Sequence, residues 1–97
     1  MAKAINYSAV TAATPIKAGT GYLQIVNITA PGDAASVVTI YDNPTAAAGT
    51  VLFQGGGGTT GSYIQTAGVS TPGVPASTGL TISIAGTTSP KVQVVYE

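Results

Sequence analysis

The chain has 97 residues, and small uncharged side chains dominate its composition. Ala, Gly, Ser and Thr make up 50 of the 97 residues, and there is no Cys, His, Trp or Arg. Three Lys balance three acidic residues, so only 6% of the residues are charged and the net charge is zero. This composition excludes disulfides, thiolate metal sites and a basic surface for nucleic acid, and the length supports one hydrophobic core.

No segment has the length of apolar sequence that a membrane requires. A spanning helix needs about 18 consecutive apolar residues, and the apolar runs here are interrupted after a few residues by Thr, Asn, Gln or Gly. Residues 1–7 carry one Lys but lack the unbroken apolar region of a secretory signal. We therefore expect the protein to be made and retained in a cytoplasm, with neither a membrane nor nucleic acid as its partner.

The first predicted elements are two short edge strands, over residues 7–11 and 14–17. Pro15 lacks a backbone donor, and it is tolerated where that side of a strand faces solvent. We interpret residues 1–17 as an N-terminal arm or a pair of edge strands, and residues 18–97 as one β-sandwich domain.

The next predicted strand, over residues 22–29, changes its apolar face partway along. Leu23 and Ile25 share one face, whereas Val26 and Ile28 share the other. Because alternate side chains of a strand point to opposite faces, this switch predicts a bulge or burial on both faces.

Two further strands, over residues 36–41 and 50–54, flank a short connection rich in Ala. The first of them is rich in β-branched and aromatic residues. In the connection, Asn43 has the position of a helix N-cap, Pro44 that of the first helical residue and Gly49 that of a terminator. The segment is long enough for one helical turn only.

Residues 55–79 are rich in Gly and Pro, with one weak strand near residues 62–66. The run from Gly56 to Gly61 has the glycine spacing of a dinucleotide-binding turn. That motif needs a following helix and an acidic residue about 20 positions later, and the sequence has neither. Ser62 also stands where a phosphate-binding loop needs Lys, so a flexible hairpin or surface loop is the better interpretation.

The last two predicted strands, over residues 80–85 and 91–96, are the clearest in the chain. Apolar residues alternate with smaller or polar ones in both, and residues 86–90 have the composition of a turn. We expect these strands to form a C-terminal hairpin. About seven to eight short strands without a helix of ordinary length predict an all-β fold, an antiparallel β-sandwich of jelly-roll-like type.

The side chains available do not assemble into a catalytic or metal site. Without His, a Ser or Thr nucleophile has only Lys or a carboxylate as its base. Asp33 and Asp42 flank a predicted strand of about six residues at about 3.3 Å each, so they lie about 20 Å apart. This exceeds the carboxyl spacing of glycosidases, and turn and cap roles are expected instead. We predict no enzyme activity, no cofactor and no metal; a weak Ca²⁺ site at either Asp, completed by backbone carbonyls, is the alternative.

A Val/Ile-rich strand that ends in Tyr41-Asp42-Asn43 is followed by small residues, Gly49-Thr50 and another apolar strand. This order, together with the preceding strand from Gly21 to Ile28, resembles small structural proteins of tailed bacteriophages. The resemblance covers about a third of the chain. It implies a virion protein on the capsid surface, made in the host cytoplasm: a cement or decoration protein with the major capsid protein as its partner and a homotrimer as its familiar form.

Five apolar or aromatic residues are candidates for contact with such a partner. Four of them lie in the N-terminal arm, which we expect to contact the shell or to exchange between protomers by strand addition. The fifth is a Tyr beside the Gly-rich segment. The candidates are Ile5, Tyr7, Val10, Ile16 and Tyr63.

The alternative function is that of a carbohydrate-binding or fibre/tail module of a phage particle. This function needs an exposed aromatic platform, for which Tyr63 and Tyr7 are the candidates. The other three Tyr residues lie in predicted strands, where packing against neighbouring side chains is the ordinary role: they are Tyr22, Tyr41 and Tyr96.

Overall fold

The structure is a computed structural model that describes residues 3–56, 58, 61–64 and 73–97, with the main chain alone for residues 61–64. The described part of the chain contains nine strands and no helix, and therefore no helix that could span a bilayer. The strands are β1 (Lys3–Tyr7), β2 (Thr11–Ala18), β3 (Gly21–Ala30), β4 (Val37–Asp42), β5 (Thr50–Gly56), β6 (Gly61–Ile64), β7 (Val74–Ala76), β8 (Gly79–Ala85) and β9 (Lys91–Tyr96).

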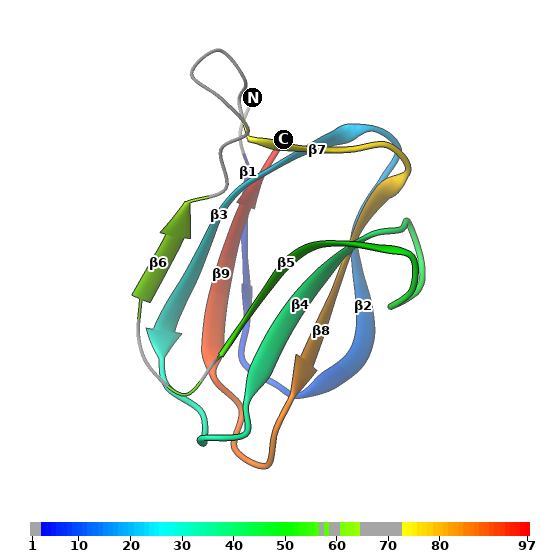
Figure 1. Cartoon of the computed structure of the whole chain (residues 1–97). Coiled ribbons are helices and arrows are strands. Elements are labelled where there is room, and N and C mark those ends of the chain that lie inside the picture. Colours follow the sequence, from blue (N-terminus) through cyan, green and yellow to red (C-terminus); the bar gives the residue numbers. More distant parts are fainter. Residues whose placement is uncertain (1–2, 57, 59–60, 65–72) are drawn as a thin grey trace.

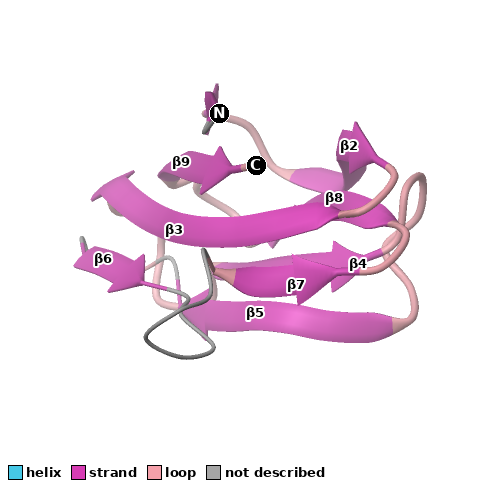
Figure 2. Ribbon diagram, turned by 90° about the horizontal axis from the view of Figure 1, so that it is seen from above, coloured by secondary structure: helices cyan, strands magenta, loops and turns pink. Residues whose placement is uncertain are grey.

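Eight of these strands form two four-stranded antiparallel sheets that pack face to face (Figure 1). Sheet A has the order β1-β9-β3-β6, and the short strand β7 pairs with the beginning of β3. Sheet B has the order β2-β8-β4-β5. Seen from above, the two sheets lie as separate layers (Figure 2). The predicted all-β, antiparallel β-sandwich is confirmed.

Strands that follow one another in the chain mostly lie in opposite sheets. The chain changes sheet after β1, β2, β3, β5, β7 and β8, and the turn between β4 and β5 stays within sheet B. In a jelly roll, a long hairpin folds over so that its strands are placed alternately in two sheets. The strand order here has this arrangement. β1 begins and β9 ends at the same end of the sandwich, because Lys3 lies opposite Tyr96 (Figure 1).

The core fills the space between the sheets, and both sheets contribute to it. Because side chains alternate along a strand, each strand presents one apolar face to the opposite sheet. Partly buried residues of β1, β2, β5, β7 and β9 pack around this core. The buried apolar residues are Leu23, Val26, Ile28, Ala76, Val92 and Val94 from sheet A, and Val38, Ile40, Phe53, Leu80, Ile82 and Ile84 from sheet B.

The change of apolar face in β3 results from a bulge. The register between β3 and β9 shifts between Leu23 and Ile25, so the alternation of faces is reset at this point. Leu23, Val26 and Ile28 are consequently all buried, whereas Ile25 is half-buried. Of the two explanations that the sequence left open, the bulge is the one observed.

The predicted C-terminal hairpin is wrong, because its two strands lie in different sheets. β8 is a central strand of sheet B between β2 and β4, and β9 is a central strand of sheet A between β1 and β3. Ile82 and Val94 are both fully buried, so the two strands contribute to the same core from opposite sheets. Residues 86–90 cross from one sheet to the other.

The connection between β4 and β5 has the capping chemistry expected of it without a helix. Asn43 Oδ1 accepts hydrogen bonds from the main-chain N–H groups of Thr45 and Ala46, at 3.0 and 2.9 Å. These are the bonds of an N-cap side chain. Gly49 ends the turn with a φ of 92°, a conformation that favours glycine.

Three of the observed strands differ notably from the prediction. Tyr7 ends β1, and residues 8–10 connect it to β2, so the strand predicted over residues 7–11 is wrong. The weak strand near residues 62–66 corresponds to β6, and residues 65 and 66 lie outside the described residues. β7 was not predicted, because the Pro at its centre argues against a strand.

Replacing Gly79 with Ala is expected to lower the free energy of unfolding by about 2–4 kcal/mol, as strain and overlap add. A Cβ at this position would lie 2.5 Å from the carbonyl oxygen of Lys17 and 2.6 Å from Cα of Pro44. Both are main-chain atoms that cannot turn away. Urea unfolding measures the effect.

The matched control is Gly19→Ala. Gly19 also has a positive φ, of 86°, but nothing lies within 4 Å of an added Cβ. Backbone strain alone predicts a loss of about 1 kcal/mol there. Equal losses at the two positions would contradict the close main-chain approach around Gly79.

Candidate functional site

Asp33 joins the turn before β4 to the crossing between β8 and β9. Its Oδ2 accepts hydrogen bonds from the main-chain N–H groups of Thr87 and Thr88, at 2.7 and 2.8 Å. Its Oδ1 accepts from the N–H of Ala35 and from the buried hydroxyl of Ser36, both at 3.0 Å. The bond from the N–H of Thr88 is the main cause that lowers the pKa of Asp33 to about 2, and the bonds from Thr87, Ser36 and Ala35 lower it further.

Asp42, the last residue of β4, accepts hydrogen bonds from the loop between β7 and β8. Its Oδ1 accepts from the main-chain N–H groups of Ser77 and Thr78, at 3.0 and 2.9 Å, and from the Thr78 hydroxyl at 3.0 Å. The N–H of Gly79 approaches the same oxygen at 3.4 Å. These bonds, led by that of Ser77, lower the pKa of Asp42 below its usual range. The carboxylate thereby holds the loop between β7 and β8 against the end of β4.

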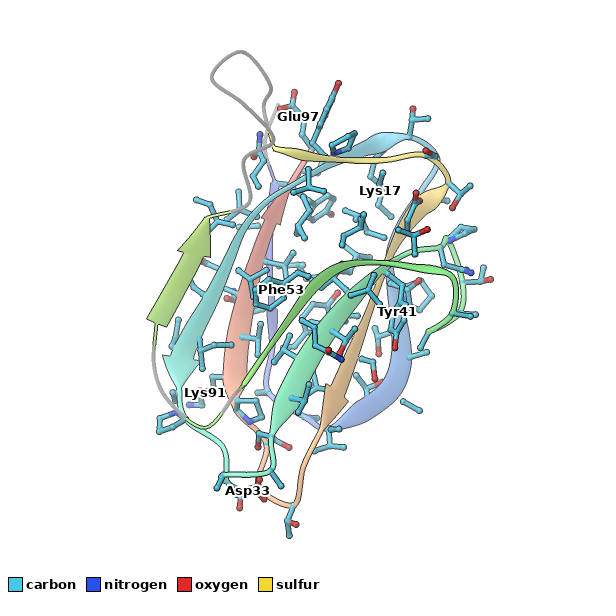
Figure 3. All side chains as sticks on the ribbon, in the orientation of Figure 1. Lys17, Asp33, Tyr41, Phe53, Lys91 and Glu97 are labelled. Carbon is cyan, nitrogen blue, oxygen red and sulfur yellow. The ribbon has the colours of Figure 1, made fainter. Side chains whose placement is uncertain are left out.

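The two carboxylates therefore serve as structural acceptors at opposite ends of the sandwich. Asp33 lies at the lower end in Figure 3, far from Lys17 and Glu97 at the upper end. Both side chains are surrounded by N–H and O–H donors, which favour a carboxylate and disfavour a bound cation. No group of three or more metal-ligating side chains exists among the described residues.

The candidate contact residues of the first two strands are mostly turned inward. Ile5, Tyr7 and Ile16 are half-buried and pack against the core. Val10 is 45% exposed, and its N–H donates to the Ser89 hydroxyl at 2.8 Å. The main chain of Tyr63 lies in β6, and its side chain is outside the description. Among the four whose side chains are described, three pack inward and Val10 is exposed, so these four do not form one exposed surface.

Tyr7 carries a buried hydroxyl that has no hydrogen-bond partner among the described residues. Burial raises the pKa of Tyr7, and the nearby Tyr96 raises it further. A buried hydroxyl without a partner costs free energy that a purely apolar ring would not. The ring of Tyr7 therefore stabilises the core, and its buried hydroxyl reduces that stabilisation.

β5 forms an open edge of sheet B. Its strand partner among the described residues is β4, so its outer row of N–H and C=O groups faces away from the sheet. Over its seven residues, β5 has neither Pro nor a charged side chain. Val51, on this strand, is 47% exposed. An uncharged edge of this kind is a surface to which a strand of another chain can add.

The other edges carry features that oppose such pairing. β2, at the opposite edge of sheet B, contains Pro15 and Lys17, and its register is irregular at two places. β1, at one edge of sheet A, has five residues and begins with Lys3. Pro, Lys, short length and bulges are the usual devices that protect an edge strand. β6, at the other edge of sheet A, has four residues. The sequence predicted contacts through the N-terminal strands, whereas β5, with one register shift in its pairing with β4, is an edge of seven residues that has neither Pro nor a charged side chain.

Tyr7→Phe is expected to raise the free energy of unfolding by about 1 kcal/mol, because it removes a buried polar atom without a partner. Thermal or urea unfolding measures this. Tyr96→Phe is the matched control, with little change expected. A loss of stability in Tyr7→Phe would mean that the hydroxyl has a partner in solution.

Asp33→Asn is expected to lower stability at neutral pH and to flatten its dependence on acid. Because the folded pKa of about 2 lies below the usual 3.8, the stabilisation is complete above about pH 4 and is lost as the pH falls toward 2. Urea unfolding from about pH 7 to about pH 2 measures the slope. Thr87→Ala, which keeps the donating N–H, should retain the wild-type profile; an unchanged slope in Asp33→Asn would contradict the assignment.

Comparisons of the chain with protein-family models, with curated proteins and with solved structures find no match.

Proposed function

We propose that this chain is a structural protein of a bacteriophage particle, one that decorates the capsid and stabilises it by bridging neighbouring capsid subunits. The open, uncharged edge of β5 carries the proposal. Added main-chain hydrogen bonds along such an edge give affinity without any charged or catalytic group. The sequence resemblance of residues 21–52 supports the choice of a phage particle.

The charge distribution supports binding in a crowded shell. No charged residue occurs between Asp42 and Lys91, a range that includes β5, β6, β7 and β8. Copies placed close together on a shell would therefore bring few like charges near one another. The two internal carboxylates are engaged with the protein's own loops, which leaves assembly as the function that this surface fits best.

In this mechanism, each bound copy adds to the free energy that holds neighbouring capsid subunits together. Each copy pairs its β5 edge with an extended segment of one capsid subunit and covers part of the next, so that separating the subunits also requires loss of this pairing. Binding as a homotrimer at positions of local three-fold symmetry is the arrangement that the resemblance implies. The N-terminal strands remain the second candidate contact.

Val51→Lys is expected to weaken binding to capsids by at least about tenfold, because it places an unpaired charge at the pairing edge. The assay is co-sedimentation of the purified chain with shells assembled from the major capsid protein of the same genome. Wild-type binding should saturate at a fixed number of copies per shell.

Val10→Lys is the matched variant, since Val10 and Val51 are exposed to almost the same extent, 45% and 47%. Loss of binding in Val10→Lys alone would place the capsid contact at the N-terminal strands instead of at β5. Ala34→Lys, in an exposed turn, controls for added charge. Absence of saturable binding by the folded wild-type chain would end the capsid proposal.

A further inference from the structure

Three residues from neighbouring strands form a row on the outer face of sheet A. Tyr22 lies opposite Pro75 of β7. On its other side, Tyr22 and Glu97 exchange two main-chain hydrogen bonds, of 2.7 and 2.9 Å. Side chains directly opposite one another project to the same face of a sheet. Leu23, the next residue, is fully buried in the core, so Tyr22 and its two neighbours face away from the core.

A pocket of about 460 Å³ opens over this row. Tyr22, Pro75 and Glu97 line it together with the side chains of Thr20 and Ser77. The volume lies within the range of about 300–1,000 Å³ that is usual for small-molecule sites. Figure 3 places Glu97 at the upper end of the sandwich, beside β7 and the end of β9.

The lining combines an aromatic ring with several oxygen atoms. Tyr22 is half-buried and lines the pocket. The hydroxyls of Thr20 and Ser77 belong to exposed residues. The Glu97 carboxylate accepts a hydrogen bond from Gln24 Nε2 at 3.3 Å, which links its Oε2 to the neighbouring strand.

This combination matches a ligand with one apolar face and hydroxyl groups around its edge. The C–H face of a pyranose ring stacks on an aromatic ring, and its hydroxyls donate to carboxylate and hydroxyl oxygens. Glu97 adds a negative charge to the lining, and the Lys17 side chain passes beside Gly21. We propose that this pocket binds a neutral saccharide of one or two pyranose units.

The close pairing of the end of β9 with the beginning of β3 beside this pocket depends on Gly21. A Cβ there would overlap the carbonyl oxygen of Glu97 and the side chain of Lys17. The proposal is independent of capsid attachment, since the pocket lies on the outer face of sheet A and β5 belongs to sheet B.

The experiment is a glycan-array screen of the purified chain, followed by titration calorimetry with the best neutral saccharide. Tyr22→Ala is expected to weaken that binding by at least about tenfold, since it removes the aromatic ring on which the pyranose face stacks. Tyr41→Ala is the matched control. Tyr41 follows the buried Ile40, so it is a half-buried Tyr on the outer face of sheet B.

A second readout uses the unmodified chain, in case Tyr22→Ala does not fold. Addition of the saccharide should shift the backbone amide resonances of Tyr22, Ser77 and Glu97, while those of Val51 and Ala34 stay in place. No saccharide binding on the array, equal loss in Tyr22→Ala and Tyr41→Ala, or shifts confined to other strands would each overturn the proposal. Capsid co-sedimentation of the same preparations reports on the other function separately.

Discussion

Two crossings of the sandwich, between β7 and β8 and between β8 and β9, are held by carboxylates that lie at opposite ends of β4. A jelly roll sends its chain from sheet to sheet at both ends, and loop N–H groups there have no strand partner. Asp33 accepts from two N–H groups of the crossing between β8 and β9, and Asp42 accepts from the loop between β7 and β8. Each bond to an ionised acceptor is stronger than one between neutral groups.

The structural role of these two carboxylates limits the groups that are left to bind a partner. A chain with few charged residues has committed both internal carboxylates to its own loops, and the donors around them keep their pKa values low. A carboxylate held in this way is a poor general acid at neutral pH. The two proposals therefore rest on a main-chain edge, an aromatic ring and hydroxyl groups.

The sequence predicted local features better than their placement in space. Alternation of apolar residues predicted a bulge or two-sided burial in β3, of which the bulge is observed, and Asn43 predicted the capping turn. Both features depend on neighbours along the chain. The supposed C-terminal hairpin was wrong for a physical reason. Periodicity identifies which face of a strand is buried. It does not show whether two such strands lie side by side in one sheet or face each other across the core from different sheets. The sheet to which each strand belongs is a long-range property.

The same limit explains the candidate sites. Tyr22 was assigned to packing because it lies in a strand, yet the bulge after Leu23 leaves it outside while Leu23 fills the core. Its partners, Pro75 and Glu97, come from sequence positions far apart, so no local pattern marked the row. β5 likewise became a candidate edge only when the strand order was known.

An edge and a pocket of these kinds are compatible within one small domain. Pairing along β5 uses main-chain groups and needs few particular side chains, whereas the pocket depends on Tyr22 and the oxygen atoms around it. The two surfaces belong to different sheets, and the core between them is continuous. Closely packed cores deform little, so occupation of one surface should leave the other nearly unchanged. The proposed attachment through β5 and the proposed recognition at the pocket can therefore be tested separately.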